Sequence, residues 1–293
     1  MKLFIRKIVL FFLTVISLFT LLLLFLTYVN TRALENYRIP ADISQLFIGD
    51  SHVQLSINDK QLPNSINMAK PGESTYYTFY KLGPVLKNNP SIKKVYLGYS
   101  YHTISSYTND NIYGTRSKDI APRYFFILPF REKVKMVTHN INNLPTFFRN
   151  GLTRGFHTVL AKNKNFSFIG GYENSFSKTA AIKESMDKRI TMQYYENDTI
   201  RDFSYSNINY LDKIIELCKK RNVELLLLNT PIHPYYKSRI PQKFITKYND
   251  LIIKNSLKQI AFEGLKMSDS CYIADGDHLS IMGALLTTAY LKK

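Results

Sequence analysis

The chain has 293 residues, enough for one large domain or two small ones, and its two cysteines are too few for a disulfide-built scaffold. Its formal net charge of +17 favours an anionic partner such as a nucleic acid, a membrane surface or an acidic polymer, although a solvated basic surface explains it equally well. No group of His and Cys residues has metal-ligand spacing, so the sequence predicts neither a metal nor a cofactor.

The first predicted element is an uncharged stretch over residues 8–29. About 20 apolar residues in helical rise span a hydrocarbon core of roughly 30 Å, so this stretch predicts a transmembrane helix, with residues 1–29 forming a cytoplasmic tip and anchor. Lys2, Arg6 and Lys7 precede it, and positive charge beside a membrane helix stays on the cytoplasmic side. A cleaved secretory signal, whose apolar region is only about 7–15 residues long, is the alternative.

Either way we expect the body of the chain outside the cytoplasm, and with an uncleaved anchor the protein is a single-pass protein of the bacterial cytoplasmic membrane. An exported chain meets little nucleic acid. Anionic headgroups or an acidic cell-surface polymer are therefore the partners that fit the positive charge.

A polar connector is predicted at residues 30–40, and residues 41–293 then alternate between strands and helices. Strands are predicted at 44–50, 64–69, 93–100, 223–231 and 271–275, and helices at 74–88, 207–221, 242–261 and 280–293. The continuous apolar run at 223–231 suits a strand that is buried on both faces. The alternation predicts an α/β domain with a parallel sheet covered by helices on both faces.

An insertion is predicted at about residues 103–207, where this rhythm breaks. The segment has weak periodicity, many aromatic residues and scattered basic ones. Long segments of this kind inside α/β domains are usually functional insertions or lids. We expect it to form a platform for the substrate.

Polar residues gather where the predicted strands end. In an open parallel sheet, ligands bind outside the carboxyl ends of the strands. Those ends carry Asp50, Ser51 and His52; Lys70, Pro71 and Gly72; Gly98, Tyr99, Ser100, Tyr101 and His102; Asn229, Thr230 and His233; and Asp275, Asp277 and His278. A parallel sheet would align these Ser, His and Asp side chains along one edge.

The motif "DGDHLS" can activate a serine. A serine hydroxyl needs an adjacent imidazole as base, and the imidazole needs a carboxylate to fix its tautomer. Asp275 and His278 are three residues apart, so a tight turn can bring the carboxylate to Nδ1 while Nε2 points at Ser51. By itself the motif also fits a cap on the last helix, formed by Asp277 or Ser280.

Taken together and in this order, "GDS" at residues 49–51 and "DGDH" at 275–278 resemble the end blocks of the SGNH (GDSL-type) hydrolase superfamily. The resemblance implies a three-layer α/β/α, flavodoxin-like fold, with Ser51 as nucleophile, His278 as base and Asp275 as the group that orients it. It also implies an oxyanion hole built from the amide of Ser51 and from Gly72, which matches the family's glycine block in "AKPGES". A glycine there lets a backbone N–H approach the developing oxyanion.

The third block departs from the family pattern. Where the family has Gly-x-Asn-Asp, this chain has Gly98, Tyr99, Ser100 and Tyr101. Ser100 therefore replaces the asparagine as the expected third oxyanion donor, and a serine hydroxyl reaches less far. Loss of one oxyanion donor costs about 10²–10³ in rate in a measured protease, so the replacement argues against efficient hydrolysis.

The anchor and the motifs together resemble a narrower group, the membrane-anchored SGNH-like proteins that accompany acyl transfer to cell-surface polymers. Examples are the D-alanyl-lipoteichoic acid transfer protein and the alginate O-acetylation proteins. The matching pieces are "FIGDSH", "VELLLLNTPIHPYY" and "DGDHLSIMGA", together with roughly residues 64–100. The resemblance implies a multi-spanning membrane acyltransferase as partner and acyl donor.

We therefore predict an O-acyltransferase that passes an acyl group, in the simplest case acetyl, through an ester on Ser51 to an acidic or neutral cell-surface polymer. An esterase with the same triad and a non-catalytic polymer-binding scaffold are the alternatives. His52, His102 and His233 are candidates for lining the pocket. Cys218 and Cys271 are expected to be buried thiols, and the sequence leaves open whether they pair.

Overall fold

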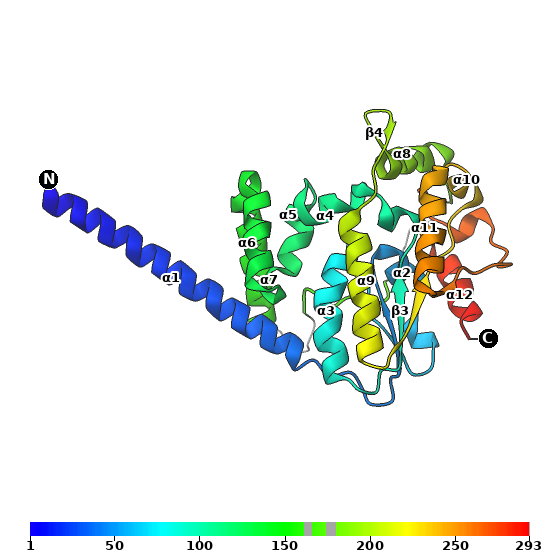
Figure 1. Cartoon of the computed structure of the whole chain (residues 1–293), viewed down its shortest axis with the longest axis horizontal. Helices are drawn as coiled ribbons and strands as arrows, with labels where there is room; N and C mark the ends of the chain where they lie inside the picture. Colours follow the sequence, from blue (N-terminus) through cyan, green and yellow to red (C-terminus); the bar gives the residue numbers. More distant parts are fainter. Residues whose placement is uncertain (161–165, 174–179, 293) are drawn as a thin grey trace.

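The computed structural model describes residues 1–160, 166–173 and 180–292. Its central sheet has five parallel strands in the order β2-β1-β3-β6-β7, flanked by helices in Figure 1. The strands are β1 (Gln45–Ile48), β2 (Ser65–Asn67), β3 (Lys94–Gly98), β6 (Glu224–Leu228) and β7 (Lys258–Ile260). Counted along the chain this is the order 2-1-3-4-5 of flavodoxin-like folds. The predicted fold class is confirmed.

The two faces of the sheet bury two separate apolar clusters. In β1, Leu46 and Ile48 belong to one cluster and Phe47 to the other. Phe47 stacks on Tyr96 of β3 with ring centroids 4.4 Å apart. Because successive side chains of a strand point to opposite faces, the central strands are apolar after their first residues, as a sheet covered on both sides requires.

Helices cover both faces and complete the three layers. α3 (Thr75–Asn88), α9 (Tyr205–Lys220) and α11 (Gln242–Asn255) contribute to the larger cluster, whereas α2 (Ser51–Ser56) and α12 (Ile281–Tyr290) pack against each other over the smaller one. α9 is the amphipathic helix predicted at 207–221. Its apolar residues are buried as its 3.6-residue period requires.

Near the C-terminus, one predicted helix has the wrong end and one predicted strand is wrong. The expected helix at 242–261 ends at Asn255, where Ser256 takes a left-handed φ of 51°, and residues 258–260 form the edge strand β7. The expected last strand at 271–275 is not in the sheet, because Tyr272 pairs only with Leu279 in an isolated antiparallel bridge. Helical and strand patterns are hard to separate in short apolar runs. Here the left-handed residue Ser256 ends the helix, so the residues after it can form a strand.

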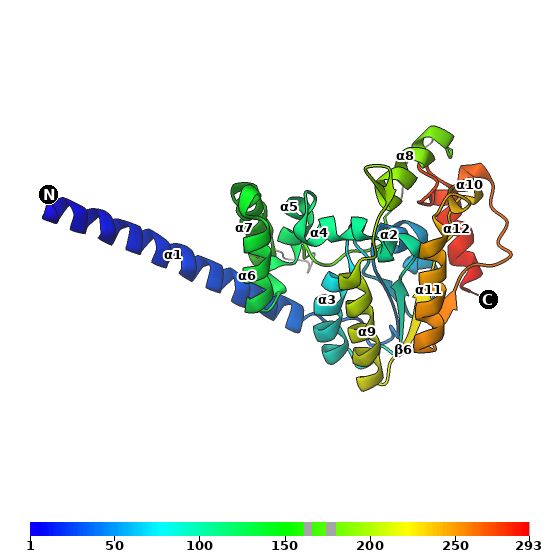
Figure 2. The ribbon, with the colours of Figure 1, turned by 45° about the horizontal axis from the view of Figure 1, so that its top comes forward.

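The N-terminal helix α1 (Lys2–Glu35) projects from the body of the molecule in both views (Figures 1 and 2). Its 34 residues are long and apolar enough to cross a membrane. The helix continues six residues beyond Val29, so part of the expected connector at 30–40 is helical. Leu26, Asn30 and Leu34 are buried against the rest of the chain, whereas most residues before them are exposed.

The described part of the predicted insertion is largely helical. It contains α4 (Asp110–Tyr113), α5 (Ser117–Ile120), α6 (Phe130–His139), α7 (Leu144–Leu160), α8 (Lys183–Tyr194) and the hairpin of β4 (Tyr195–Glu196) and β5 (Thr199–Ile200). Short 3₁₀ turns join them: η2 (Tyr101–Ile104), η3 (Ser106–Asn109), η4 (Ala121–Arg123), η5 (Phe125–Ile127) and η6 (Ile141–Asn143). The remaining short elements are η1 (Asp59–Gln61), α10 (Pro234–Lys237) and η7 (Asp269–Cys271).

The insertion reaches two distant places. α6 and α7 stand beside α1 in Figures 1 and 2, and α7 packs on it. α8 lies instead above the carboxyl ends of the strands, next to α10. One segment therefore links the anchor to the edge of the sheet where ligands are expected.

Both cysteines are buried free thiols, as predicted. Cys218 lies in the large apolar cluster, and Cys271 lies in a small separate one with Tyr272 and Leu279. Burial raises the pKa of Cys218 to about 12, so its thiol is unreactive near neutral pH.

Candidate active site

A tight strand-to-helix turn presents Ser51. β1 ends at Ile48, and Gly49 follows with φ 145°. A Cβ on Gly49 would lie 3.0 Å from Cα of Gly98, and a Cβ on Gly98 would clash with Cγ2 of Val53 in α2, so the two glycines let the strands and α2 approach closely. Asp50 then caps α2, its Oδ1 accepting the N–H of His52 at 2.9 Å. Ser51 is thereby fixed as the first residue of α2.

The motif at residues 275–278 folds into the turn that the sequence predicted. Oδ1 of Asp275 accepts the backbone N–H groups of Asp277 and His278 at 3.0 and 3.1 Å. Oδ2 of Asp275 accepts from Nδ1 of His278 at 2.8 Å. Gly276 permits the turn with φ 62°. Ser280, not Asp277, caps α12, so Asp277 is free for another role.

Ser51, His278 and Asp275 form one continuous chain of hydrogen bonds. Nε2 of His278 lies 2.8 Å from Oγ of Ser51. Because Nδ1 donates to the carboxylate, Nε2 is left to accept the serine proton. Burial alone would raise the pKa of Asp275, but the hydrogen bond and charge of His278 outweigh it and lower that pKa, which keeps the carboxylate ionised.

Two backbone N–H groups are available for an oxyanion. Among the described residues, the amides of Ser51 and Gly72 donate no hydrogen bond. Gly72 has φ 72°, and its carbonyl accepts from Nδ2 of Asn111 at 3.0 Å, which fixes the peptide turn. Ser100 is buried, and its N–H donates to Oγ1 of Thr103 at 3.1 Å, so only its hydroxyl could serve a substrate. The oxyanion roles stay predictions.

Gly72→Ala should lower both stability and reactivity. A left-handed φ costs a residue with a Cβ about 1–2 kcal/mol, and the new Cβ would lie 2.6 Å from Cδ1 of Ile120. We expect a lower melting temperature and about tenfold or more slower reaction of Ser51 with an activated ester, the size of a damaged oxyanion contact. Gly83→Ala is the matched control, because nothing lies within 4 Å of its Cβ position. Wild-type reactivity in Gly72→Ala would remove this residue from the oxyanion hole.

Three imidazole rings form a column beside the serine. The ring of His52 lies 4.6 Å from that of His278 and stacks on that of His102 at 4.1 Å, measured between centroids. His52 and His102 are buried, as His278 is, and their role in lining a pocket stays a prediction. Burial first, and then the charge of His102, lower the pKa of His52. Because His52 is then neutral, it does not repel the positive charge that His278 acquires when His278 takes up a proton.

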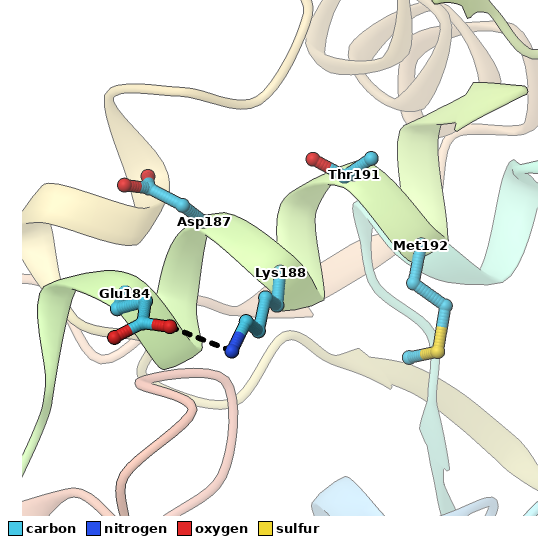
Figure 3. A pocket seen from close by; sticks show the side chains of 5 residues that line it. All are labelled: Glu184, Asp187, Lys188, Thr191 and Met192. Atoms are coloured by element: carbon cyan, nitrogen blue, oxygen red, sulfur yellow. Dashed lines mark hydrogen bonds and ion pairs between the residues drawn. The ribbon is translucent and has the colours of Figure 1, made fainter. Parts of the chain in front are cut away.

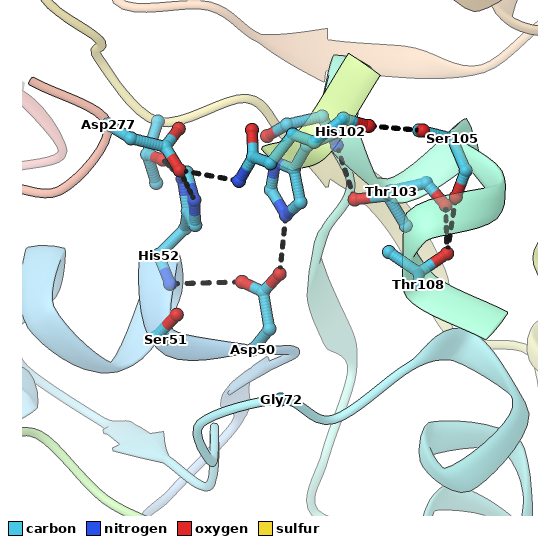
Figure 4. Close-up of polar contacts among 12 residues, drawn as sticks. Asp50, Ser51, His52, Gly72, His102, Thr103, Ser105, Thr108 and Asp277 are labelled. Carbon is cyan, nitrogen blue, oxygen red and sulfur yellow. Dashed lines mark hydrogen bonds and ion pairs between the residues drawn. The ribbon is translucent and has the colours of Figure 1, made fainter. Parts of the chain in front are cut away.

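Two further carboxylates hold this column (Figure 4). Oδ2 of Asp50 accepts from Nε2 of His102 at 2.7 Å, and Oδ2 of Asp277 lies 3.3 Å from Nε2 of His52. Burial would raise both pKa values, but the neighbouring imidazoles and, at Asp277, the guanidinium of Arg189 lower them instead. Both carboxylates are therefore ionised within the fold.

Helix α8 of the insertion completes the network. Nε of Arg189 and Nε2 of Gln193 each donate to Oδ2 of Asp277 at 2.8 Å. These two side chains are one helical turn apart, so they lie on the same face of α8. Nothing in the sequence predicted this contact. The spacing of four residues places Arg189 and Gln193 on one face of a helix, but it does not identify Asp277 as their partner.

His233 has a different place from His52 and His102. Its Nδ1 accepts the N–H of Tyr235 and so caps α10, and its Nε2 lies 3.1 Å from Oδ1 of Asp269. Its backbone N–H donates to the carbonyl of Gly276 at 2.8 Å. His233 therefore supports the turn that carries His278, while its ring takes no part in the hydrogen-bond chain to Ser51.

His52, His102 and Asp277 are also close enough to be considered as metal ligands, with their ligand atoms within 4.8 Å of one another. However, the stacked rings of His52 and His102 are inclined by only 22°, so their in-plane lone pairs run side by side and do not converge. Nε2 of His102 already binds Asp50. The trio fits a buried charge network better than a metal site.

The pocket in Figure 3 lies on α8, and no residue of the triad lines it. It is lined by Glu184, Asp187, Lys188, Thr191 and Met192, and Glu184 pairs with Lys188 at 2.7 Å. Both partners are well exposed, so the pair contributes little to stability. We assign this pocket no role in the chemistry.

Fold and site together define a serine-triad protein on a flavodoxin-like sheet, which is the arrangement that the resemblance to SGNH hydrolases implies. No family model and no curated protein matches the chain.

Three of the solved structures that are similar to the chain come from bacteria. One from Streptococcus pneumonia is assigned as a platelet activating factor (TM-score 0.43, 16% identity, 96% of this chain and 97% of that chain). One from Bacteroides fragilis is assigned as an acylhydrolase (TM-score 0.39, 11% identity, 90% of this chain and 92% of that chain). One from Bacteroides thetaiotaomicron is a GDSL-like lipase (TM-score 0.38, 11% identity, 87% of this chain and 88% of that chain). Because these TM-scores are low, the class of protein is assigned from the strand order and the triad, and not from the similarity to these structures.

Proposed function

We propose that the protein is a membrane-anchored O-acyltransferase that carries an acyl group on Ser51 and passes it to a hydroxyl of a cell-surface polysaccharide or related polymer. The observation that carries the proposal is the unbroken hydrogen-bond chain from Ser51 through His278 to Asp275. Such a chain is what an oxygen nucleophile needs to form an ester at neutral pH. Acetyl is the simplest acyl group for this chemistry.

The first half-reaction loads the serine. Oγ of Ser51 attacks the donor's acyl carbon as Nε2 of His278 takes its proton, and Asp275 stabilises the imidazolium. The oxyanion of the tetrahedral intermediate accepts from the N–H groups of Ser51 and Gly72, with the hydroxyl of Ser100 as a third donor. The intermediate collapses when the donor's leaving oxygen departs with the proton from His278, which leaves acyl-Ser51.

The second half-reaction reverses these roles. His278 takes the proton of the acceptor hydroxyl as its oxygen attacks the acyl carbon of the serine ester. Oγ of Ser51 then leaves and recovers the proton, and the acceptor keeps the acyl group. Water gives hydrolysis by the same route, so transfer needs an acceptor held in place and water kept out.

The anchor supports transfer over hydrolysis. A helix long enough to cross a membrane would keep Ser51 close to a membrane-bound acyl donor, and we propose a multi-spanning acyltransferase as that donor. The positive residues before the apolar stretch support an extracytoplasmic domain on the cytoplasmic membrane. The net charge of +17 suits an acidic acceptor polymer.

The acyl content of the cell-surface polymer tests the proposal. Deleting the gene should lower it, wild-type protein should restore it, and the Ser51→Ala variant at equal abundance should not. Higher acyl content after deletion would mean that the protein is an esterase. Restoration by Ser51→Ala would mean that it acts as a scaffold without catalysis.

A further inference from the structure

A second cavity, of about 380 Å³, lies between α7 and the loop that follows β2. Its lining residues are Lys70, Asn150, Thr153, Arg154, His157, Phe166 and Ser167. Lys70 comes from the carboxyl edge of the sheet, two residues before Gly72, whereas four of the others come from α7. The cavity thus adjoins the catalytic loop on its anchor side, and the acyl chemistry described above does not use it.

The cavity gathers positive charge with only partial compensation: the exposed carboxylate of Asp119 lies 3.5 Å from Nδ2 of Asn150, and its charge only partly offsets the effects of burial and Arg123 on the pKa of Arg154. In the described part of the chain, no ion pair involves Lys70, Arg154 or the neighbouring Arg123. Residues 161–165 and 174–179 contain no Asp or Glu, so they cannot supply a partner either. The buried carboxylate of Glu73, whose charge acts on Lys70, is already paired with Lys81. An anion from outside the chain would balance these cations.

The two arginines also have unused hydrogen-bonding capacity. Among the described residues, the buried Nε atoms of Arg123 and Arg154 have no hydrogen-bond partner. Arg123 is fixed by donating from a terminal nitrogen to the carbonyl of Pro71 at 2.6 Å, and its carbonyl accepts from the hydroxyl of Ser167 at 3.2 Å. Burial, followed by the charge of Arg123, lowers the pKa values of Lys70 and Arg154. A bound anion would relieve this mutual repulsion.

The position of α7 along α1 gives the depth of the cavity. Phe148 packs edge-on against Phe19, within the uncharged stretch, with ring centroids 5.7 Å apart. Seven residues later, the carbonyl of Gly155 accepts from Nδ2 of Asn30 at 3.4 Å, and Asn30 directly follows that stretch. If α1 spans a bilayer, Arg154 lies where the hydrocarbon ends and the headgroup layer, about 5–7 Å thick on each side, begins.

We propose that this cavity binds the phosphate of an anionic lipid headgroup at the membrane surface, with Lys70 and Arg154 as its cationic ligands. A phosphate offers the oxygens that an arginine fork and a lysine ammonium recognise. Asn150, Thr153 and Ser167 add neutral polar groups to the lining, and a phosphate would compete with the carbonyls of Arg149 and Arg123 for the hydroxyl protons of Thr153 and Ser167. A soluble phosphate ester presents the same chemistry, and the depth of Arg154 along α1 favours the lipid. The proposal depends on α1 spanning a bilayer and is independent of the reaction at Ser51.

Native mass spectrometry of the full chain in detergent micelles tests it. Phosphatidylglycerol should bind with one high-affinity site, and phosphatidylcholine, whose phosphate is neutralised by choline, at least about tenfold more weakly. The Lys70→Gln/Arg154→Gln variant should lose about tenfold or more in affinity for phosphatidylglycerol. Lys219→Gln/Lys220→Gln is the matched control, because it removes the same charge from exposed positions at the end of α9.

The outcomes separate the sources of the phosphate. sn-Glycerol 3-phosphate is the soluble ligand for comparison. If it binds as tightly as the lipid and depends equally on Lys70 and Arg154, the site binds a soluble phosphate and the lipid proposal is overturned. Equal losses in the two double variants, or no preference between the two lipids, would overturn the site altogether. Arg154→Lys keeps the charge if the double variant fails to fold, and it should bind phosphatidylglycerol more weakly than wild type, because it loses the planar fork.

Discussion

Ser51→Ala should abolish covalent labelling of the full-length protein by a fluorophosphonate and lower acyl transfer by about 10⁴-fold or more. The hydroxyl of Ser51 is the one that lies 2.8 Å from Nε2 of His278, and alanine leaves the base without a nucleophile. The substitution removes one oxygen from a partly exposed side chain, so the fold should be unaffected. Labelling is read by in-gel fluorescence, and folding by the melting temperature.

Ser238→Ala is the control for this prediction, because Ser238 is exposed and its hydroxyl only caps a local turn. It should label like wild type. His278→Ala should also lose the label, since no other imidazole contacts Oγ of Ser51 in the described structure. If the Ser51→Ala protein still takes up the probe at the wild-type rate, the nucleophile is another residue.

The arrangement of Ser51, His278 and Asp275 could be predicted from the sequence because each part of it is held by a local turn. Asp275 and His278 are held by one turn, and Ser51 by one strand end, so the motifs needed only a parallel sheet to meet. The observed parallel strand order brings the two motifs together. The burial of Cys218 was equally predictable, because the apolar period of α9 fixes which side faces the sheet.

The support of the site could not be predicted, because it depends on contacts distant in sequence. Arg189 and Gln193 come from the aromatic insertion and reach Asp277 more than eighty residues later. The last strand was missed for a different reason. Residues 258–260 are partly exposed at the sheet edge, so they lack the apolar signature of β6. Edge strands carry weak sequence signals because only one side of them is paired.

The motif "DGDH" holds two ionised carboxylates with different partners, and this sets up a matched comparison. Asp275 contacts His278, the proposed base, whereas Asp277 contacts His52 and Arg189. Both lie in one turn and both have lowered pKa values. Replacing each by asparagine removes one negative charge from almost the same place. Any difference between the variants therefore reports which imidazole each carboxylate serves.

Asp275→Asn should slow labelling of Ser51 and acyl transfer by about 10³–10⁴, with little loss of stability. An amide can donate to Nδ1 of His278, which would favour the tautomer whose Nε2 carries the proton and cannot accept from the serine. Asp277→Asn should keep the rate within about tenfold of wild type, because the hydrogen bonds among Ser51, His278 and Asp275 are untouched. Labelling rates at several pH values measure both effects.

Asp277→Asn should instead lower stability, and in a pH-dependent way. Its carboxylate is buried and accepts from Arg189, which is itself mostly buried, so removing the charge should cost about 3 kcal/mol at neutral pH. Because the folded-state pKa of Asp277 is lowered below an unfolded value of about 3.9, this stabilisation is present above that pH and is lost as the pH falls through the folded pKa. Wild type and Asp277→Asn should therefore converge in melting temperature on acidification. A larger rate loss in Asp277→Asn than in Asp275→Asn would reverse the roles of the two carboxylates.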